Sequence, residues 1–185
     1  MSKHLLILAL AAMVLFGNCG SEDDEPTNNE GTPTISLDDL SRGQGSIAVS
    51  GNESFNYDGI VVGANLRGTI NDKTYNILRI TVPSDEAGDN RSLSLTFYIP
   101  TALDQTVPPN GNITITSDDA SLDETYASCF VIGENDTYNS LSTSVGTVTV
   151  SNSSTASNSF GAFFEVENLN SFDDNELDAR GAFKF

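Results

Sequence analysis

The chain has 185 residues and carries 26 Asp and Glu residues against 8 Lys and Arg residues, a formal net charge of −18 at pH 7. So acidic a protein repels phosphate backbones, which disfavours nucleic acid as a partner. It also offers no polybasic patch that could bind anionic lipid headgroups. Its single histidine, His4, falls in the N-terminal signal described below. The mature chain would therefore lack Ser-His-Asp and Cys-His nucleophiles and any histidine-ligated zinc, copper or haem.

Residues 1–18 have the pattern of a secretory signal. Lys3 and His4 precede an unbroken apolar run at 5–16, which is too short for a helix that crosses a bilayer, since that needs roughly 20 residues. The run ends in LFGNC, which resembles a lipobox, so we expect cleavage before Cys19 and lipidation of its thiol. Several acyl chains on one cysteine anchor a protein firmly without a transmembrane helix. The alternative is ordinary secretion, with cleavage near Gly17 and an unmodified Cys19.

The stretch that follows predicts a flexible acidic tether over residues 19–36. Its beginning, GSEDDE at 20–25, resembles the acidic export signal that Bacteroidota place behind the lipidated cysteine of surface lipoproteins. This resemblance implies a protein anchored in the outer membrane and exposed at the cell surface. Residues 37–185 then form a single domain, a length sufficient for one hydrophobic core.

From Ser46 onward apolar and polar residues alternate, and clusters of Gly, Asn, Asp and Pro interrupt the pattern, which predicts antiparallel strands. Asn71, Asp72 and Lys73 predict a hairpin turn. Residues 134–142 should be a polar loop, and 151–159 a flexible connection. Strands are expected around 47–49, 55–64, 66–70, 74–82, 92–99, 113–115, 126–132, 147–150, 160–167 and 179–185. We therefore predict an all-β domain, either an antiparallel β-sandwich or a flattened β-barrel of nine or ten strands.

Two of these strands define the expected core. In 92–99 every second residue is apolar, from Leu93 to Ile99, while Ser and Thr occupy positions between them. In 126–132 nearly every residue is apolar, which predicts a central strand covered on both faces. Cys129 lies in this strand and should be a small buried hydrophobic residue, not a nucleophile.

The segment GAFFEVENL…ELDARGAFKF, which ends in the Gly-x-Phe-x-Phe strand 181–185, resembles the last hairpin of small, functionally uncharacterised lipoproteins of Bacteroidota. NGNITIT at 110–116 and SVGTVTVS at 144–151 resemble the middle strands of the same proteins. The resemblance implies a β-domain on a lipid anchor, and it brings no known activity and no catalytic residues.

Two acidic segments are candidate calcium sites, because calcium binds six to eight carboxylate and carbonyl oxygens. Neither has the spacing of an EF-hand, so solvated loops are the favoured interpretation and calcium the alternative. The candidate ligands are Asp118, Asp119 and Asp123 in the first segment and Asp173, Asp174, Glu176 and Asp178 in the second.

A pair of carboxylates can hydrolyse glycosides without histidine, but the chain has no Trp on which a sugar ring could stack. We therefore expect no catalytic residue and no cofactor. The favoured hypothesis is a non-catalytic surface lipoprotein whose loops bind an extracellular protein or glycan. The alternatives are a structural or coat lipoprotein without a specific ligand and a carboxylate-only glycan hydrolase.

Overall fold

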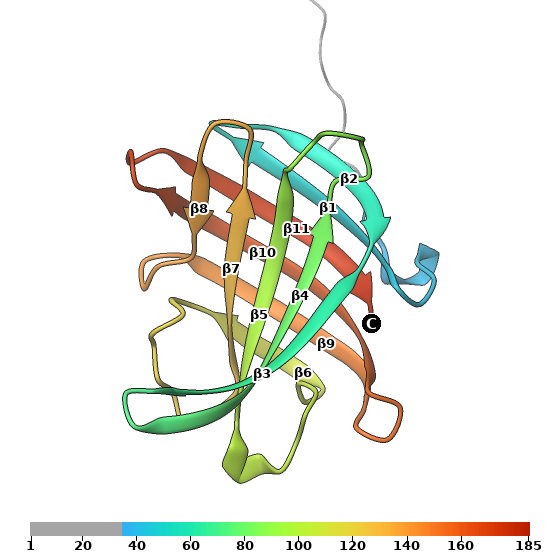
Figure 1. The fold of residues 1–185 in the computed structure, drawn as a ribbon, viewed down its shortest axis with the longest axis vertical. Coiled ribbons are helices and arrows are strands. Elements are labelled where there is room, and N and C mark those ends of the chain that lie inside the picture. Colours follow the sequence, from blue (N-terminus) through green and yellow to red (C-terminus); the bar gives the residue numbers. More distant parts are fainter. Residues whose placement is uncertain (1–34) are drawn as a thin grey trace, which may run out of the picture. The chain divides into compact units, whose positions relative to one another are not determined.

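Residues 35–185 form eleven β-strands and two short 3₁₀ helices in the computed structural model, which describes this part of the chain (Figure 1). The predicted signal, Cys19 and residues 19–34 of the predicted tether lie outside the described residues. The all-β class is confirmed, and no helix in residues 35–185 is long and apolar enough to cross a membrane. The elements are η1 (Leu37–Asp39), β1 (Gln44–Gly51), β2 (Phe55–Ile60), β3 (Val62–Ile70), β4 (Lys73–Pro83), β5 (Ser92–Pro100), η2 (Thr101–Leu103), β6 (Gly111–Ile115), β7 (Tyr126–Ile132), β8 (Thr137–Asn139), β9 (Val145–Ser154), β10 (Ser159–Ser171) and β11 (Glu176–Lys184).

The strands form one continuous sheet in the order β2-β1-β11-β10-β9-β6-β7-β5-β4-β3. Because β8 pairs with both β10 and β7, it closes a small barrel with β6, β7, β9 and β10, and the other strands extend from its two sides. In Figure 1, β3, β4, β5 and β7 form the front layer, and β9, β10 and β11 cross behind them. The pairings are antiparallel, as predicted, except for the single parallel pair Ile115↔Ala127 between β6 and β7.

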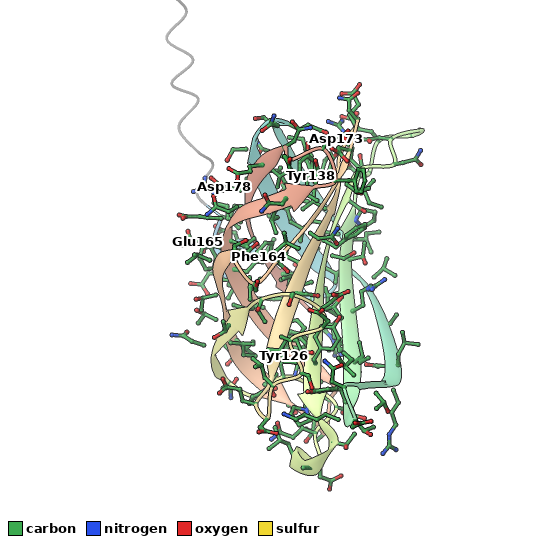
Figure 2. All side chains as sticks on the ribbon, turned by 90° about the vertical axis from the view of Figure 1, so that its left-hand side faces the viewer. Tyr126, Tyr138, Phe164, Glu165, Asp173 and Asp178 are labelled. Carbon is green, nitrogen blue, oxygen red and sulfur yellow. The ribbon has the colours of Figure 1, made fainter. Side chains whose placement is uncertain are left out.

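Alternation along the strands builds the core, as the sequence predicts. Leu95 and Phe97 of β5 are fully buried, and Phe97 packs edge-on against Phe160 of β10 with ring centroids 5.6 Å apart. On β10, Phe164 lies between the two layers and Glu165 lies on the outside (Figure 2). The period of two therefore directs one side of each strand into the core. The other side meets solvent on β10 but is covered on β5, where Ser94, Thr96 and Tyr98 are also buried.

The predicted number of nine or ten strands is too low, because β8 lies inside residues 134–142, which we expected to be a polar loop. This strand of only three residues has no visible period, and Tyr138 is its single buried side chain. Its conformation comes from pairing with β7 on one side and β10 on the other. Tertiary contacts thus override a sequence that is typical of a loop.

The break predicted at Asn65 falls instead at Val61. There the chain passes from β2, which pairs with β1, to β3, which pairs with β4. The Val61 N–H donates to the Gly43 carbonyl oxygen at 2.9 Å, the last contact with the β1 side. The change of pairing partner occurs within the apolar run Ile60–Val62, so the amino-acid composition at this point does not reveal it.

Two polar stretches also contribute more strand than predicted. Of residues 151–159, expected to be flexible, only 155–158 form a turn, and Ser153 Oγ donates to the Pro108 carbonyl oxygen at 2.6 Å. Only residues 173–175 of the acidic stretch 173–178 form a loop, because β11 begins at Glu176. The hairpin at Asn71 and Asp72 is confirmed: both have positive φ, as a two-residue turn between twisted strands requires.

Candidate functional site

The first predicted acidic segment forms the loop between β6 and β7. Asp118, Asp119 and Asp123 are exposed, and Asp123 makes an ion pair of 2.8 Å with Lys73 in β4. The Asp123 side chain is 94% exposed, so this pair contributes little to stability. The three carboxylates do not face a common point that could hold a cation.

The backbone of this loop covers a cluster of tyrosines on the outer face of the sheet. Tyr98 and Tyr126 stack with ring centroids 4.6 Å apart, and Tyr75 packs edge-on against both. The Tyr75 O–H donates to the Leu122 carbonyl oxygen at 2.7 Å, and the Tyr126 O–H donates to that of Asp118 at 3.4 Å. The loop therefore has a structural role, because it covers the aromatic cluster and its backbone carbonyl oxygens accept hydrogen bonds from two of the tyrosine hydroxyl groups.

The second predicted acidic segment is divided between a turn and a strand. Asp173 and Asp174 lie in the β10–β11 turn, whereas Glu176 and Asp178 belong to β11 and are exposed on its outer face. Asp178 Oδ1 accepts a hydrogen bond from the backbone N–H of Asn168 at 3.1 Å. This carboxylate bridges two neighbouring strands.

The two acidic segments do not come together. In Figure 2, Asp173 lies with Tyr138 at one end of the fold, and Tyr126, which the first loop covers, lies toward the other. Within residues 35–185 no group of three or more His, Cys, Asp or Glu side chains could hold a metal ion. The described side chains thus give the calcium hypothesis no set of ligands.

Three loops are joined by hydrogen bonds at the end that carries Asp173. Asn52 Nδ2 donates to Asn175 Oδ1 at 3.1 Å, and Asn175 Nδ2 donates to Asp136 Oδ2 at 3.4 Å. The backbone N–H of Glu176 returns a bond to Asn52 Oδ1 at 3.1 Å. We call this region the loop end, which consists of loops 52–54, 133–136 and 172–175 with the neighbouring loop 84–91.

Glu53 fastens the β1–β2 loop to the β7–β8 loop. Its carboxylate accepts the N–H of Glu134 at 2.6 Å, the N–H of Asn135 at 3.3 Å and the O–H of Tyr138 at 3.1 Å. Gly133 leaves room for this contact, because a Cβ there would clash with the Glu53 carboxylate. Burial, followed by the hydrogen bond and charge of Glu53, raises the pKa of Tyr138 to about 12. A carboxylate held by three donors is a structural acceptor.

Asp89, Arg91 and Tyr57 form a second closed cluster. Arg91 Nε donates to both Asp89 oxygens at 3.0 Å, and the Tyr57 O–H donates to Asp89 Oδ2 at 3.0 Å. The hydrogen bonds from Arg91 hold the pKa of Asp89 well below its usual range. Burial, followed by the hydrogen bond to Asp89, raises the pKa of Tyr57 to about 12. Neither group can therefore exchange a proton near neutral pH.

Phe172 is the large apolar side chain of the loop end that does not pack against the rest of the fold. It is 98% exposed at the tip of the β10–β11 turn. The turn is well defined, because Ser171 Oγ accepts the N–H of Asp173 at 3.2 Å and of Asn175 at 3.3 Å, while Ser171 N–H donates to the Asn175 carbonyl oxygen at 3.0 Å. The chain thus presents a large apolar ring on a fixed turn, next to two free aspartates.

A hollow of about 560 Å³ lies beside η1 and the edge of β1 and β2. Asp39, Asp58 and Asp85 contribute to its lining, and all three are exposed. A glycosidase requires one carboxylic acid that burial keeps protonated near neutral pH. The hollow offers negative charge, but solvent reaches each of these carboxylates.

Sequence reasoning missed Glu53, Asp89, Arg91 and Phe172. Only Phe172 has a signal, as an aromatic residue within the polar stretch SFDDNE. The partners of Glu53 are more than 80 residues away in the chain, so no local pattern identifies it. The expectation that Cys129 is buried is confirmed, and burial raises the pKa of its thiol.

Comparison of the chain with models of known families, with characterised proteins and with solved structures gives no match. The case for a function therefore depends on the residues themselves.

Proposed function

We propose that this protein is a non-catalytic binding module, held at the outer surface of the cell by a lipid on Cys19, and that its loop end binds a basic partner protein. The observation that carries this proposal is Phe172, a fully exposed aromatic ring on a fixed turn. Exposed aromatic anchors that become buried dominate the binding energy of many protein interfaces.

The energetic argument begins with the ring. Burial of a Phe side chain stabilises a complex by about 2 kcal/mol, and the Ser171 hydrogen bonds fix the turn before a partner arrives, which limits the entropy lost on binding. A partner with an apolar pocket for Phe172 would gain both contributions.

The charge of the loop end selects the partner. Asp173 and Asp174 follow Phe172 in the turn and are exposed, and Glu134 on the linked loop is exposed as well. Glu53 and Asp89 are held by donors within the fold and take no part in this surface. The available carboxylates favour a basic surface and accelerate its association.

The test replaces Phe172 with a photo-crosslinking phenylalanine analogue in cells that produce the full chain. We expect a crosslinked protein whose yield falls as salt rises, because the flanking charges are screened. The matched control places the same analogue at Leu103, which is 45% exposed in η2 on the β5–β6 connection.

Crosslinks of equal yield at both positions, or at neither, would contradict the proposal. A crosslinked partner that is acidic would contradict its charge argument. Phe172→Ala should abolish capture of the same partner, whereas Leu103→Ala should leave it unchanged.

A further inference from the structure

β3 is a long strand with one free edge. It pairs with β4 along all nine of its residues and lies at the end of the sheet order, and no other strand among residues 35–185 pairs with its second side. Natural proteins protect such edges with charged side chains, Pro, bulges or short strands. β3 is nine residues long, carries one charged side chain, Arg67, and no Pro, and its register with β4 has no shift.

The backbone groups at this edge can be identified from the register. The Val61 N–H donates to Gly43 on the β1 side, and successive residues of a strand direct their backbone groups to opposite sides. Odd-numbered residues therefore face the free edge, and even-numbered residues bond to β4. The residues with available N–H and C=O groups are Gly63, Asn65, Arg67 and Thr69.

The outer face beside this edge is apolar. Val62 and Leu66 are 55% and 63% exposed, and Ile60, just before the bend at Val61, is 74% exposed. Across the strand, Leu66 pairs with Ile77 of β4. An added strand would lie next to this strip and could cover it with every second side chain.

The inner side of the edge has room and positive charge. A hollow of about 380 Å³ at the start of β3 is lined by Val61, Phe185 and Arg42, among others. The Phe185 ring occupies the space beneath Gly63, where a Cβ would clash with it. Further along, the Arg67 side chain is exposed and has neither an ion pair nor a hydrogen bond with the described residues.

Charge is distributed unevenly over the chain. The β3–β4 hairpin contains Arg67, Lys73 and Arg79 against Asp72 alone, in a chain whose net charge is −18. Lys73 is paired with Asp123. Arg79 lies on the outer face, where its Nε donates to Thr96 Oγ1 at 3.2 Å. Arg67 is therefore the cation that the hairpin directs to the inner side of the free edge. An occupant of the edge should therefore carry negative charge on its inward side.

We propose that the free edge of β3 binds an extended acidic segment of a partner protein, which adds to the sheet as a further strand. The segment alternates apolar residues, which cover Val62 and Leu66, with acidic residues, which face Arg67 and Arg42. Its backbone bonds to the four odd-numbered residues supply affinity, and the side chains supply specificity. A second copy of the chain fits less well, because it would place the positive hairpin against itself. This site is separate from the loop end, so either can fail without the other.

The test uses the full chain and a fluorescent heptapeptide of alternating Glu and Val, a length that matches residues 63–69. Fluorescence anisotropy measures binding, and hydrogen exchange measures protection of single amides. We expect protection at the odd-numbered residues of β3, and weaker binding of a heptapeptide of alternating Lys and Val.

Two variants decide the mechanism. Asn65→Pro removes an N–H that faces the free edge, and Asn65→Ala removes the same side chain but keeps that N–H. We expect Asn65→Pro to bind the Glu peptide up to about tenfold more weakly than Asn65→Ala, the effect of losing one hydrogen bond. Arg67→Glu should reverse the preference between the two peptides, a result that does not depend on tolerance of proline.

Equal binding by Asn65→Pro and Asn65→Ala, with the even-numbered amides still protected, would overturn strand addition. An unchanged peptide preference in Arg67→Glu would overturn the acidic partner. Light scattering that shows a dimer, with the odd-numbered amides protected before peptide is added, would assign the edge to a second copy. Phe172→Ala should leave peptide binding unchanged.

Discussion

Individual carboxylates of this acidic chain differ sharply in their surroundings. Asp89 accepts hydrogen bonds from Arg91 and Tyr57, and its side chain is 13% exposed. Asp173, on a neighbouring loop, is exposed and flanks Phe172. The first carboxylate stabilises the fold, and the second is free to meet a partner. Residue type alone cannot separate the two roles, because the difference lies in the donors around each group.

The acid stability of the protein should depend on Asp89. Its pKa is lowered in the folded state, mainly by the hydrogen bonds from Arg91, so its contribution is complete above the unfolded pKa of about 3.9 and is lost as pH falls toward the folded pKa. Asp89→Asn should therefore lower the urea midpoint at pH 7, and the gap to the unmodified protein should narrow below about pH 4. Asp85→Asn, an exposed neighbour on the same loop, is the control. A gap that stays constant down to pH 2.5 would refute the assignment.

At the scale of elements, strands with a strong period were predictable and strands set by distant partners were not. The alternation of β5 and the Asn71–Asp72 turn define their structures locally. β8 and the break at Val61 depend on pairing with strands far away in the sequence. The site divides in the same way: the acidic stretches are visible in the sequence, but Glu53 acquires its role only when β1 and β7 are brought together.

The contact between the β1–β2 and β7–β8 loops should behave as one unit. Glu53→Ala leaves the Tyr138 hydroxyl and two backbone N–H groups without their acceptor, so we expect a loss of about 2 kcal/mol in the free energy of unfolding. Gly133→Ala should lower stability by displacing the same carboxylate. Because both changes break one contact, Gly133→Ala should cost little in the Glu53→Ala background. Additive losses in urea unfolding would mean that Gly133 acts independently of Glu53.

On the whole molecule, two separate surfaces each place exposed apolar side chains beside charge, and the sign of the charge differs between them. The loop end combines Phe172 with free aspartates, and the β3 edge combines Val62 and Leu66 with Arg67. If both proposals hold, the two surfaces would select partners of opposite charge. Two separate binding surfaces of this kind would suit a protein that binds two different partner molecules at the same time.

The large net charge also predicts how stability responds to salt. At −18, repulsion between exposed acids opposes the folded state, and the 26 acidic residues far outnumber the 8 basic residues that could attract them, as in the pairs Lys73–Asp123 and Arg91–Asp89. Screening should therefore relieve more repulsion than attraction as the Debye length falls from about 20 Å to about 4 Å. We expect the unfolding temperature of the full chain to rise by about 3 °C between low salt and 0.5 M NaCl, which corresponds to roughly 1 kcal/mol. Calorimetry at pH 4, where many carboxylates are protonated, should show a smaller rise, and an unfolding temperature that falls with salt at pH 7 would show that attraction dominates.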